Sequence, residues 1–439
     1  MLSTVDAINI FNHAVEVVKP SAVISKYIKI DGDLLTIADG KLKLNDINRI
    51  YLLSVGKAAA AMALEVEKIL GDNIASGLVV TKYHHALSLT HCDTIEAGHP
   101  VPDENSIKAA TAIKKFLSSL TGNDLLLCLI SGGASALIAD MSEGISLDDL
   151  QQLSRLLLDC GASIHEINTV RKHICVLKGG QLLRHTNDAQ VISLLVSDVI
   201  RDDLSVIASG LTVADNSSFT DAWDVVDKFD LSLKIPISIK KYLQDGLKRH
   251  VMDTPKPGDS LFDRTANYII ARNEDALNAA KEAATQLGYH VNIIDKTMKG
   301  EAKEMAATFV NALMTYKGNK PACLLMGGET TVTIKGNGKG GRNQEFVLAA
   351  LIELMQLNVP AEQIPIILSG GTDGTDGPTD AAGAFIDKNV LNNVKALSYD
   401  PLPYLLNNDA YHFFKQTGTL LITGPTQTNV MDIVIGLIP

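Results

Sequence analysis

The chain has 439 residues, with 39 Lys and Arg against 50 Asp and Glu, a formal net charge of −11 and 46% hydrophobic residues. This much apolar surface excludes a disordered chain, and the acidic balance argues against a general nucleic-acid binder, which needs clustered cations. A chain of this length is expected to form at least two domains.

The N-terminal twenty residues have the pattern of a short amphipathic helix and carry Asp6 and Glu16, without the basic and apolar blocks of a signal peptide. No apolar run reaches eighteen residues, so no membrane-spanning helix is predicted. The five cysteines are scattered, with no metal-binding spacing. We therefore expect a cytoplasmic protein with no membrane partner.

Aliphatic runs of strand length alternate with helical patterns in the first half of the chain. This alternation is typical of an open α/β sheet with buried parallel strands. Ser146 and Asn105 are the expected N-caps of two of the helices. The predicted strands are 49–56, 76–82, 124–131 and 190–198, and the predicted helices are 58–70, 105–120, 146–161 and 167–183.

A change in composition near 230–262, basic and then rich in Pro and Gly, predicts a linker. The expected domains are therefore 1–250 and 260–439. The second repeats the α/β alternation. Its predicted strands are 265–272, 289–295, 321–330, 331–336, 364–371 and 429–437, with helices at 273–287, 301–316 and 343–356.

The first chemical signal is a lysine in the turn after the strand at 49–56. Lys57 directly follows Gly56 and precedes an Ala-rich helix, where a cation opposes the helix dipole. Since ligands bind at the carboxyl edge of open α/β sheets, Lys57 is expected to face a bound anion. The alternative is a solvated lysine that the turn tolerates.

The second signal is the turn SGGAS after the strand at 124–131. Its candidates are Ser131, Gly132, Gly133 and Ser135. The spacing does not match the G-x-S-x-G nucleophile elbow, and paired glycines favour a phosphate or carboxylate cradle made by backbone amides. The alternative is a tight strand–helix turn.

Two acidic loops suit a hard cation such as Mg²⁺. Asp198 ends the strand at 190–198, with Asp202 and Asp203 nearby, and the second loop, 373–380, carries three aspartates. The second loop lacks the EF-hand spacing. The alternative interpretations are capping aspartates in the first loop and solvated Asx-turns in the second. The three aspartates of the second loop are Asp373, Asp376 and Asp380.

A glycine-rich stretch precedes the helix at 343–356. Gly336, Gly338 and Gly341 satisfy G-x-G-x-x-G, which invites a dinucleotide-binding interpretation. The motif lies deep in the chain after a short polar segment, which weakens that interpretation. Arg342 follows directly, and its planar fork of donors suits phosphoryl oxygens.

Several segments together closely resemble the glycerate 2-kinase family, whose C-terminal half is called the MOFRL domain. The matching segments are EAGHPVPDENS (96–106), SGGASALI, INTVRKHICVLKGG (167–180), VSDVIRDDLSVIASGLTVAD, GGETTVTIKGNGKGGRNQE, GTDGTDGPTDAAGAFID (372–387) and TGPTQTNVMD (423–432). They span nearly the whole chain in order. Two departures are Ala134, where the family usually has a third Gly, and Leu211, in place of a common Pro.

The resemblance implies ATP-dependent phosphorylation of D-glycerate at its 2-hydroxyl group, with ATP and Mg²⁺ as cofactors. It also implies a Rossmann-like three-layer N-terminal domain, a smaller α/β C-terminal domain and an active site in the cleft between them. Lys57 and Arg342 match positions that the family would use for catalysis.

The residues fit that chemistry, since phosphoryl transfer needs positioning and charge neutralisation. Asp198 is expected to be the third catalytic residue, and which acid serves as base stays open. The expected metal ligands are Asp198, Glu329, Asp373 and Asp376. The remaining candidates bind substrate or phosphate: Ser131, Gly132, Gly133, Ser135, His99, Gly336, Gly338, Gly340, Gly341, Asn343 and Glu345. For His99 the alternative is a turn cap.

Two other functions are kept as alternatives. An NAD(P)-dependent hydroxypyruvate reductase would use the three spaced glycines, and a non-catalytic nucleotide or sugar-acid sensor would use the same scaffold. Lys57, Arg342 and the loop aspartates argue against a sensor, which need not keep charges for a transition state. The expected partners are D-glycerate and a nucleotide. The oligomeric state stays open, with a homodimer among the possibilities.

Overall fold

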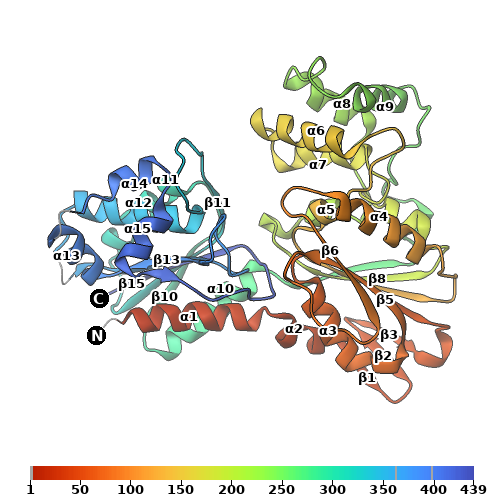
Figure 1. Cartoon of the computed structure of the whole chain (residues 1–439). Helices are drawn as coiled ribbons and strands as arrows, with labels where there is room; N and C mark the ends of the chain where they lie inside the picture. Colours follow the sequence, from red (N-terminus) through yellow and green to blue (C-terminus); the bar gives the residue numbers. More distant parts are fainter. Residues whose placement is uncertain (1–2, 361–362, 397–398) are drawn as a thin grey trace. The chain divides into compact units, whose positions relative to one another are not determined.

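The computed structural model describes residues 3–360, 363–396 and 399–439. The chain forms two compact units. The central unit is Val23–Ile270, and the terminal unit combines the N-terminal residues up to Ala22 with Ala271–Pro439. The boundaries predicted from the sequence, 1–250 and 260–439, differ from this division at both edges. In each unit helices cover a six-stranded sheet (Figure 1), which confirms the predicted α/β class.

The sheet of the central unit has the order β6-β5-β4-β7-β8-β9. The strand pairs from β6 to β8 are all parallel. Their buried aliphatic runs explain the clear sequence signal. The strands are β4 (Ile50–Val55), β5 (Ile74–Lys82), β6 (Cys92–Ala97), β7 (Leu125–Ile130), β8 (Gln190–Val196) and β9 (Thr265–Ala271).

Helices cover both faces of this sheet. Leu53 and Val55 pack with Ile113 of α4 (Glu104–Leu117) in one core cluster. The side chain of Ser54, which points to the opposite face, donates to the carbonyl of Ala59 at the start of α3 (Ala59–Leu70). This alternation produces the predicted three-layer arrangement.

Four further helices of the central unit share a separate apolar cluster, and Figure 1 shows them gathered beyond α5. A small antiparallel sheet has the order β1-β2-β3. The four helices are α6 (Leu147–Asp159), α7 (Ile164–His173), α8 (Phe219–Lys228) and α9 (Ile237–Leu247), and the short α5 (Ala134–Leu137) precedes them in the chain. The strands of the small sheet are β1 (Ile28–Asp31), β2 (Leu34–Ile37) and β3 (Gly40–Lys43), and α2 (Pro20–Tyr27) precedes β1.

The sheet of the terminal unit has the order β10-β11-β15-β12-β13-β14. Among the described strands of this sheet, only the β10–β11 pair is parallel. The strands are β10 (His290–Glu301), β11 (Ala322–Thr331), β12 (Ile366–Gly371), β13 (Gly383–Ile386), β14 (Leu420–Leu421) and β15 (Asp432–Ile438). Because β15 lies between β11 and β12, the C-terminal strand occupies the middle of the sheet.

Helices α1 and α10 pack together and against this sheet, while α11 and α12 pack together and, with α13–α15, lie on the other side in Figure 1. The helices are α1 (Thr4–Val17), α10 (Asn273–Gln286), α11 (Ala302–Thr315), α12 (Arg342–Gln356), α13 (Lys388–Ala396), α14 (Leu402–Leu406) and α15 (Ala410–Thr417). Among the described residues, no helix combines the length and apolar character needed to cross a bilayer.

Contacts of Phe11, Asp6 and Val18 hold the N-terminal segment in the terminal unit. A Cβ built on Gly370 of β12 would lie 2.7 Å from the Phe11 ring, so the glycine lets this aromatic residue approach the sheet. The Tyr289 hydroxyl donates to Asp6 at 2.7 Å, and the Thr428 hydroxyl donates to the carbonyl of Val18 at 2.8 Å. These contacts join segments that lie hundreds of residues apart.

Four local predictions were wrong. Asp103, rather than Asn105, caps α4 and forms a capping box with Ser106. The helix predicted at 167–183 ends at His173, and two glycines with left-handed backbone follow at 179–180. The strand predicted at 331–336 is irregular beyond Thr331. The strand predicted at 265–272 forms β9 of the central sheet rather than part of the second domain.

Candidate functional site

The central unit has a topological switch point between β4 and β7. The chain runs from β4 outward to β5 and β6, then returns to add β7 and β8 on the other side of β4. Ligands of open α/β sheets bind outside the carboxyl ends of the strands at such a point. Lys57 follows β4 and Ser131 follows β7, so two predicted turns meet at the position where a ligand is expected.

Backbone contacts join these two turns. The Lys57 N–H donates to the carbonyl of Gly132 at 2.9 Å, and the Ala58 N–H donates to Ser131 Oγ at 3.0 Å. Gly56 has φ +134°, and a Cβ there would lie 2.2 Å from Ser131 Oγ. Only glycine therefore permits this approach. Ser131 is fully buried and its hydroxyl supports the turn that carries Lys57.

Gly133 brings two more predicted residues together. Its backbone is left-handed, with φ +87°, and a Cβ built there would lie 3.0 Å from the His99 ring and 3.2 Å from Lys57 Cγ. His99 and Lys57 thus flank the same glycine. Both side chains are half-buried, as expected of groups that line a ligand site.

A chain of hydrogen bonds between hydroxyl and amide groups supports the same turn. Ser135 Oγ and Ser209 Oγ are 2.7 Å apart, and Ser209 Oγ donates to Asn168 Oδ1 at 2.9 Å. Ser209 and Asn168 were not singled out from the sequence. Ser209 has φ +55°, unusual for a residue with a side chain, and such strain clusters at functional sites.

Asp198 lies two residues after the end of β8 and is half-buried. Because β8 pairs with β7, Asp198 follows the strand adjacent to the one that carries Ser131. Asp203 instead accepts hydrogen bonds from the Ser205 N–H at 2.9 Å and from the Ser205 hydroxyl at 2.7 Å. Its turn-capping interpretation therefore holds.

In the terminal unit, Arg342 is the first residue of α12 and is held by two carboxylates. Its Nε donates to Asp432 Oδ2 at 2.5 Å and its Nη2 to Asp432 Oδ1 at 2.9 Å. Its Nη1 lies 2.6 Å from Glu329 Oε1. Glu329 belongs to β11 and Asp432 begins β15, which pairs with β11. The sheet therefore fixes both carboxylates relative to each other.

The electrostatics of Arg342 follow from this arrangement. Burial by itself would lower the pKa of Arg342, but the charge of Asp432 and its hydrogen bonds raise that pKa above its ordinary value. The guanidinium is therefore always charged. Asp432 was not predicted as a site residue. The available signal was one carboxylate, Asp432, directly before the run IVIGLI at 433–438.

Asp376 serves the N-terminus of α12. Its Oδ1 accepts from the Asn343 N–H at 3.1 Å and its Oδ2 from the Gln344 N–H at 2.8 Å. Burial raises the pKa of Asp376 to about 6, although these two amide bonds act in the opposite direction. With both oxygens engaged, Asp376 acts as a cap for the helix that presents Arg342.

Asn343 and Glu345 anchor the first turn of α12. Asn343 Oδ1 accepts from the Ser369 hydroxyl at 2.6 Å, and Glu345 Oε2 accepts from Asn408 Nδ2 at 3.0 Å. These bonds tie the helix to β12 and to the loop before α15. Both contacts orient the helical turn that carries Arg342, and the substrate-binding role of Asn343 and Glu345 stays a prediction.

The glycine-rich stretch has a different structural role from the expected phosphate cradle. The Gly336 N–H donates to Asn408 Oδ1 at 3.0 Å, and the Gly338 N–H donates to the carbonyl of Asn407 at 2.9 Å. A Cβ on Gly336 would lie 2.3 Å from the Asn407 carbonyl oxygen. These amides are thus used within the fold, and the phosphate-binding role of Gly336 and Gly338 stays a prediction.

Gly340 and Gly341 lie closer to Arg342. A Cβ on Gly341 would lie 2.3 Å from the Asp376 carboxylate, whereas Gly340 has only ordinary to tight contacts from 3.3 Å. Their phosphate-binding role stays a prediction. Because ten residues without helix or strand separate β11 from α12, the stretch lacks the tight strand–turn–helix context of a dinucleotide site.

Two aspartates of the second acidic loop are engaged in local hydrogen bonds, and the metal-binding role predicted for Asp373 stays a prediction. Asp373 Oδ1 accepts from the Thr375 N–H at 3.0 Å and from its hydroxyl at 3.1 Å, as in an Asx-turn. Asp380 is exposed and accepts from the Tyr411 hydroxyl at 2.8 Å. Over residues 3–360, 363–396 and 399–439, no three His, Cys, Asp or Glu side chains are grouped to hold a metal.

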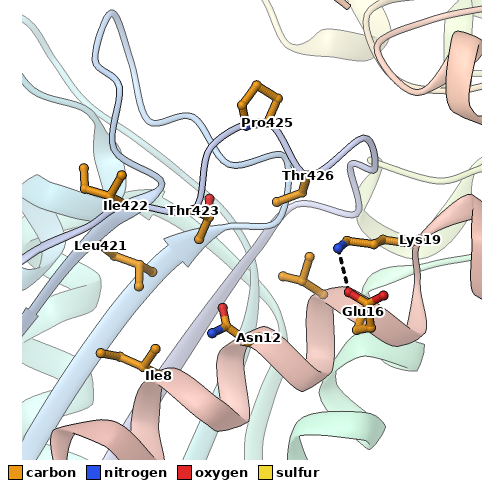
Figure 2. A pocket seen from close by; sticks show the side chains of 10 residues that line it. Ile8, Asn12, Glu16, Lys19, Leu421, Ile422, Thr423, Pro425 and Thr426 are labelled. Atoms are coloured by element: carbon orange, nitrogen blue, oxygen red, sulfur yellow. Dashed lines mark hydrogen bonds and ion pairs between the residues drawn. The ribbon is translucent and has the colours of Figure 1, made fainter. Parts of the chain in front are cut away.

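A cavity of about 320 Å³ lies in the terminal unit between α1 and the segment 421–426 (Figure 2). Its charged residues, Lys19 and Glu16, form an ion pair with each other at 2.6 Å. The Thr426 N–H donates to the carbonyl of Asp373 at 3.4 Å, so one wall borders the aspartate loop. None of the predicted site residues lines this cavity.

Two family models match the chain. Residues 6–244 match a domain of unknown function, DUF4147, and residues 322–432 match the MOFRL family. Each match lies within one of the predicted domains, 1–250 and 260–439. The second includes Glu329, Arg342 and Asp432.

Curated relatives match over most of the chain. A D-glycerate 2-kinase of Thermotoga maritima is 42% identical, covering 90% of this chain and 92% of the relative. A glycerate 2-kinase of Pyrococcus horikoshii is 37% identical, covering 98% and 96%. A relative from Agrobacterium vitis, 39% identical over 88% of this chain and 86% of its own, carries the provisional name of a hydroxypyruvate reductase.

Solved structures show the same fold. The crystal structure of a Thermotoga maritima glycerate kinase aligns with a TM-score of 0.83 at 39% identity, covering 99% of each chain. That of a Pyrococcus horikoshii protein aligns with a TM-score of 0.79 at 37% identity, covering 100% and 99%.

Proposed function

The chain belongs to the glycerate 2-kinase family, and we propose that it transfers the γ-phosphoryl group of ATP to the 2-hydroxyl group of D-glycerate. The products are 2-phosphoglycerate and ADP. The observation that carries the proposal is the pair of positioned cations. Lys57 stands at the switch point of one sheet, and Arg342 is held rigidly at the first turn of α12.

The central unit supplies the ammonium of Lys57 and the turn around Gly133. The Lys57 side chain neutralises charge on the transferring group, where a preorganised cation has its largest effect. His99, which flanks the same glycine, contacts the glycerate carboxylate. Asp198, one strand further along, accepts the proton of the 2-hydroxyl group as the oxygen attacks phosphorus.

The terminal unit supplies the guanidinium of Arg342. Its planar fork matches the geometry of phosphoryl oxygens, and charge neutralisation is the main requirement of phosphoryl transfer. Lys57 and Arg342 both serve the same migrating group. The interdomain location of the active site, the cytoplasmic location and the homodimer stay predictions.

The carboxylates fit a Mg²⁺ site in which substrate phosphates complete the coordination. Magnesium sites often use one or two protein carboxylates together with substrate phosphates, so the lack of a three-residue cluster in the described part of the chain is compatible with it. Asp373 is the residue proposed to hold the ion, since Glu329 pairs with Arg342, Asp376 caps α12 and Asp198 is proposed as the base. When bound, Mg²⁺ would neutralise charge on the nucleotide phosphates.

The direct test is phosphorus NMR of the product after incubation with ATP, Mg²⁺ and D-glycerate. The expected spectrum shows ADP and 2-phosphoglycerate. A second reaction with NADH and hydroxypyruvate, without ATP, tests the reductase alternative. The proposal is wrong if the second mixture turns over and the first does not. Binding of ATP without any product in the first mixture would instead favour the sensor.

A further inference from the structure

Arg342 presents two usable edges of its guanidinium group. The edge formed by Nε and Nη2 is filled by both oxygens of Asp432. The other edge, formed by Nη1 and Nη2, has one carboxylate contact in the described structure, from Nη1 to Glu329 Oε1 at 2.6 Å. An anionic oxygen that binds this second edge must therefore share it with Glu329 or replace it.

The two carboxylates differ in burial. The Asp432 side chain is 1% exposed, whereas the Glu329 side chain is 42% exposed and the Arg342 side chain 31% exposed. An exposed ion pair contributes little to stability, because water solvates both partners when they separate. A buried partner is costly to remove, since it would leave an uncompensated charge. Asp432 is the permanent partner and Glu329 the exchangeable one.

The charges around Arg342 also favour an exchangeable Glu329. The positive charge of Arg342 is surrounded by Asp432, Glu329 and Asp376, all of which contribute to its electrostatic environment. When all three are ionised, one cation faces three anions. If the cluster did not change, an approaching phosphoryl group would meet net repulsion. Withdrawal of the solvent-exposed carboxylate, Glu329, relieves this repulsion.

We propose that Asp432 is a positioning residue that fixes the Arg342 guanidinium, and that Glu329 is an exchangeable counter-ion that an anionic oxygen of the substrate displaces. This inference rests on the proposed function, because it assumes that Arg342 receives a phosphoryl group. It gives Glu329 a role different from the metal ligand predicted from the sequence. The site therefore selects ligands whose negative charge can compete with a carboxylate.

The first test measures the dissociation constant of inorganic phosphate by equilibrium dialysis, without nucleotide or metal, on the full chain. E329Q removes the competing charge and should bind phosphate about twofold to fivefold more tightly, the fold-change that matches a partly exposed ion pair. The matched control is E304Q, which removes an exposed carboxylate of α11 and should leave the constant unchanged. In the R342A background, E329Q should have no effect.

The second test concerns positioning. D432N keeps the shape of the side chain but loses its charge, and it should reduce kcat about a hundredfold with a smaller change in KM, the cost of a misplaced catalytic group. R342K keeps the charge and cannot make the two-point contact. It should show the same loss of kcat, which keeps the test decisive if D432N fails to fold.

Unchanged or weaker phosphate binding by E329Q would overturn the exchangeable role, and wild-type kcat in R342K or a folded D432N would overturn the positioning role. Failure of the proposed function looks different. In that case the wild-type chain does not phosphorylate glycerate at all, whereas the phosphate-binding comparison can still be read.

Discussion

The guanidinium of Arg342 and the carboxylate of Asp432 meet edge to edge, at 2.5 and 2.9 Å, although ninety positions separate them in the chain. The pair joins the first turn of α12 to the first residue of the central strand β15. A cation that must neutralise a moving charge works best when its geometry is fixed before the substrate arrives. This contact provides that rigidity.

The stability of the fold should depend strongly on this pair. D432A leaves the partly exposed guanidinium without its main partner but still beside Glu329, so the free energy of unfolding should fall by about 1–3 kcal/mol. Urea denaturation measures the change. D380N, which alters an exposed aspartate of the same unit, should stay within about 0.5 kcal/mol of wild type. Equal losses in the two variants would contradict the assigned role of Asp432.

Asp376 predicts a specific dependence of stability on pH. Because burial raises the pKa of Asp376 from 3.8 to about 6, the folded chain holds this proton between those values while the unfolded chain has released it. The free energy of unfolding contributed by Asp376 therefore decreases as the pH rises from about 4 to 6, by about 3 kcal/mol in total, and is constant above that window.

D376N isolates this effect, since Asn does not titrate. The unfolding free energy of the wild type minus that of D376N, measured by urea denaturation from pH 4 to 7, should decrease up to pH 6 and then level off. A difference that is flat across the whole range would show that Asp376 does not carry a raised pKa.

Gly133 offers a test of the turn at the switch point with a closely matched control. G133A would place a methyl group 3.0 Å from the His99 ring and 3.2 Å from Lys57 Cγ, at φ +87°. Gly144 has nearly the same backbone, φ +85°, but a Cβ there would meet nothing within 4 Å. Both variants should lose about 1 kcal/mol of stability from backbone strain.

Only G133A should also lose turnover, because it displaces two side chains proposed to bind substrate. A fall in kcat/KM of about tenfold to a hundredfold is expected, with G144A near wild type in a steady-state assay. Similar activity in G133A and G144A would contradict the proposal that Gly133, Lys57 and His99 belong to one site.

Much of the fold could be predicted from local patterns. The buried parallel strands β4, β5, β7 and β8 are continuous aliphatic runs, which have few alternatives. The assignment of α1 and β9 to units could not be predicted in the same way. An amphipathic helix or an edge strand matches any apolar surface, and its partner is chosen by long-range contacts such as Phe11 on Gly370.

A candidate site could be proposed from the sequence to the extent that single residues oppose a local rule. Lys57 at a helix N-terminus and Arg342 after paired glycines are such residues. The role of Gly336 and Gly338 depends on the segment 407–409, about seventy positions away, and Asp432 depends on sheet order. Neither dependence can be read from the local spacing of residues, so the glycine motif alone suggested a ligand-binding loop.

The central claim is that Lys57 and Arg342 act on the same phosphoryl group, and a double-mutant cycle on kcat/KM for glycerate tests it most directly. Each of K57A and R342A should reduce turnover of the folded enzyme by about 10²–10³, and R342A should also lose stability because it leaves the buried Asp432 unpaired. Because residues that act as a unit are not additive, the double variant should be much more active than the product of the two losses predicts. Two independent, fully multiplicative losses, or near-wild-type activity in either single variant, would contradict the account.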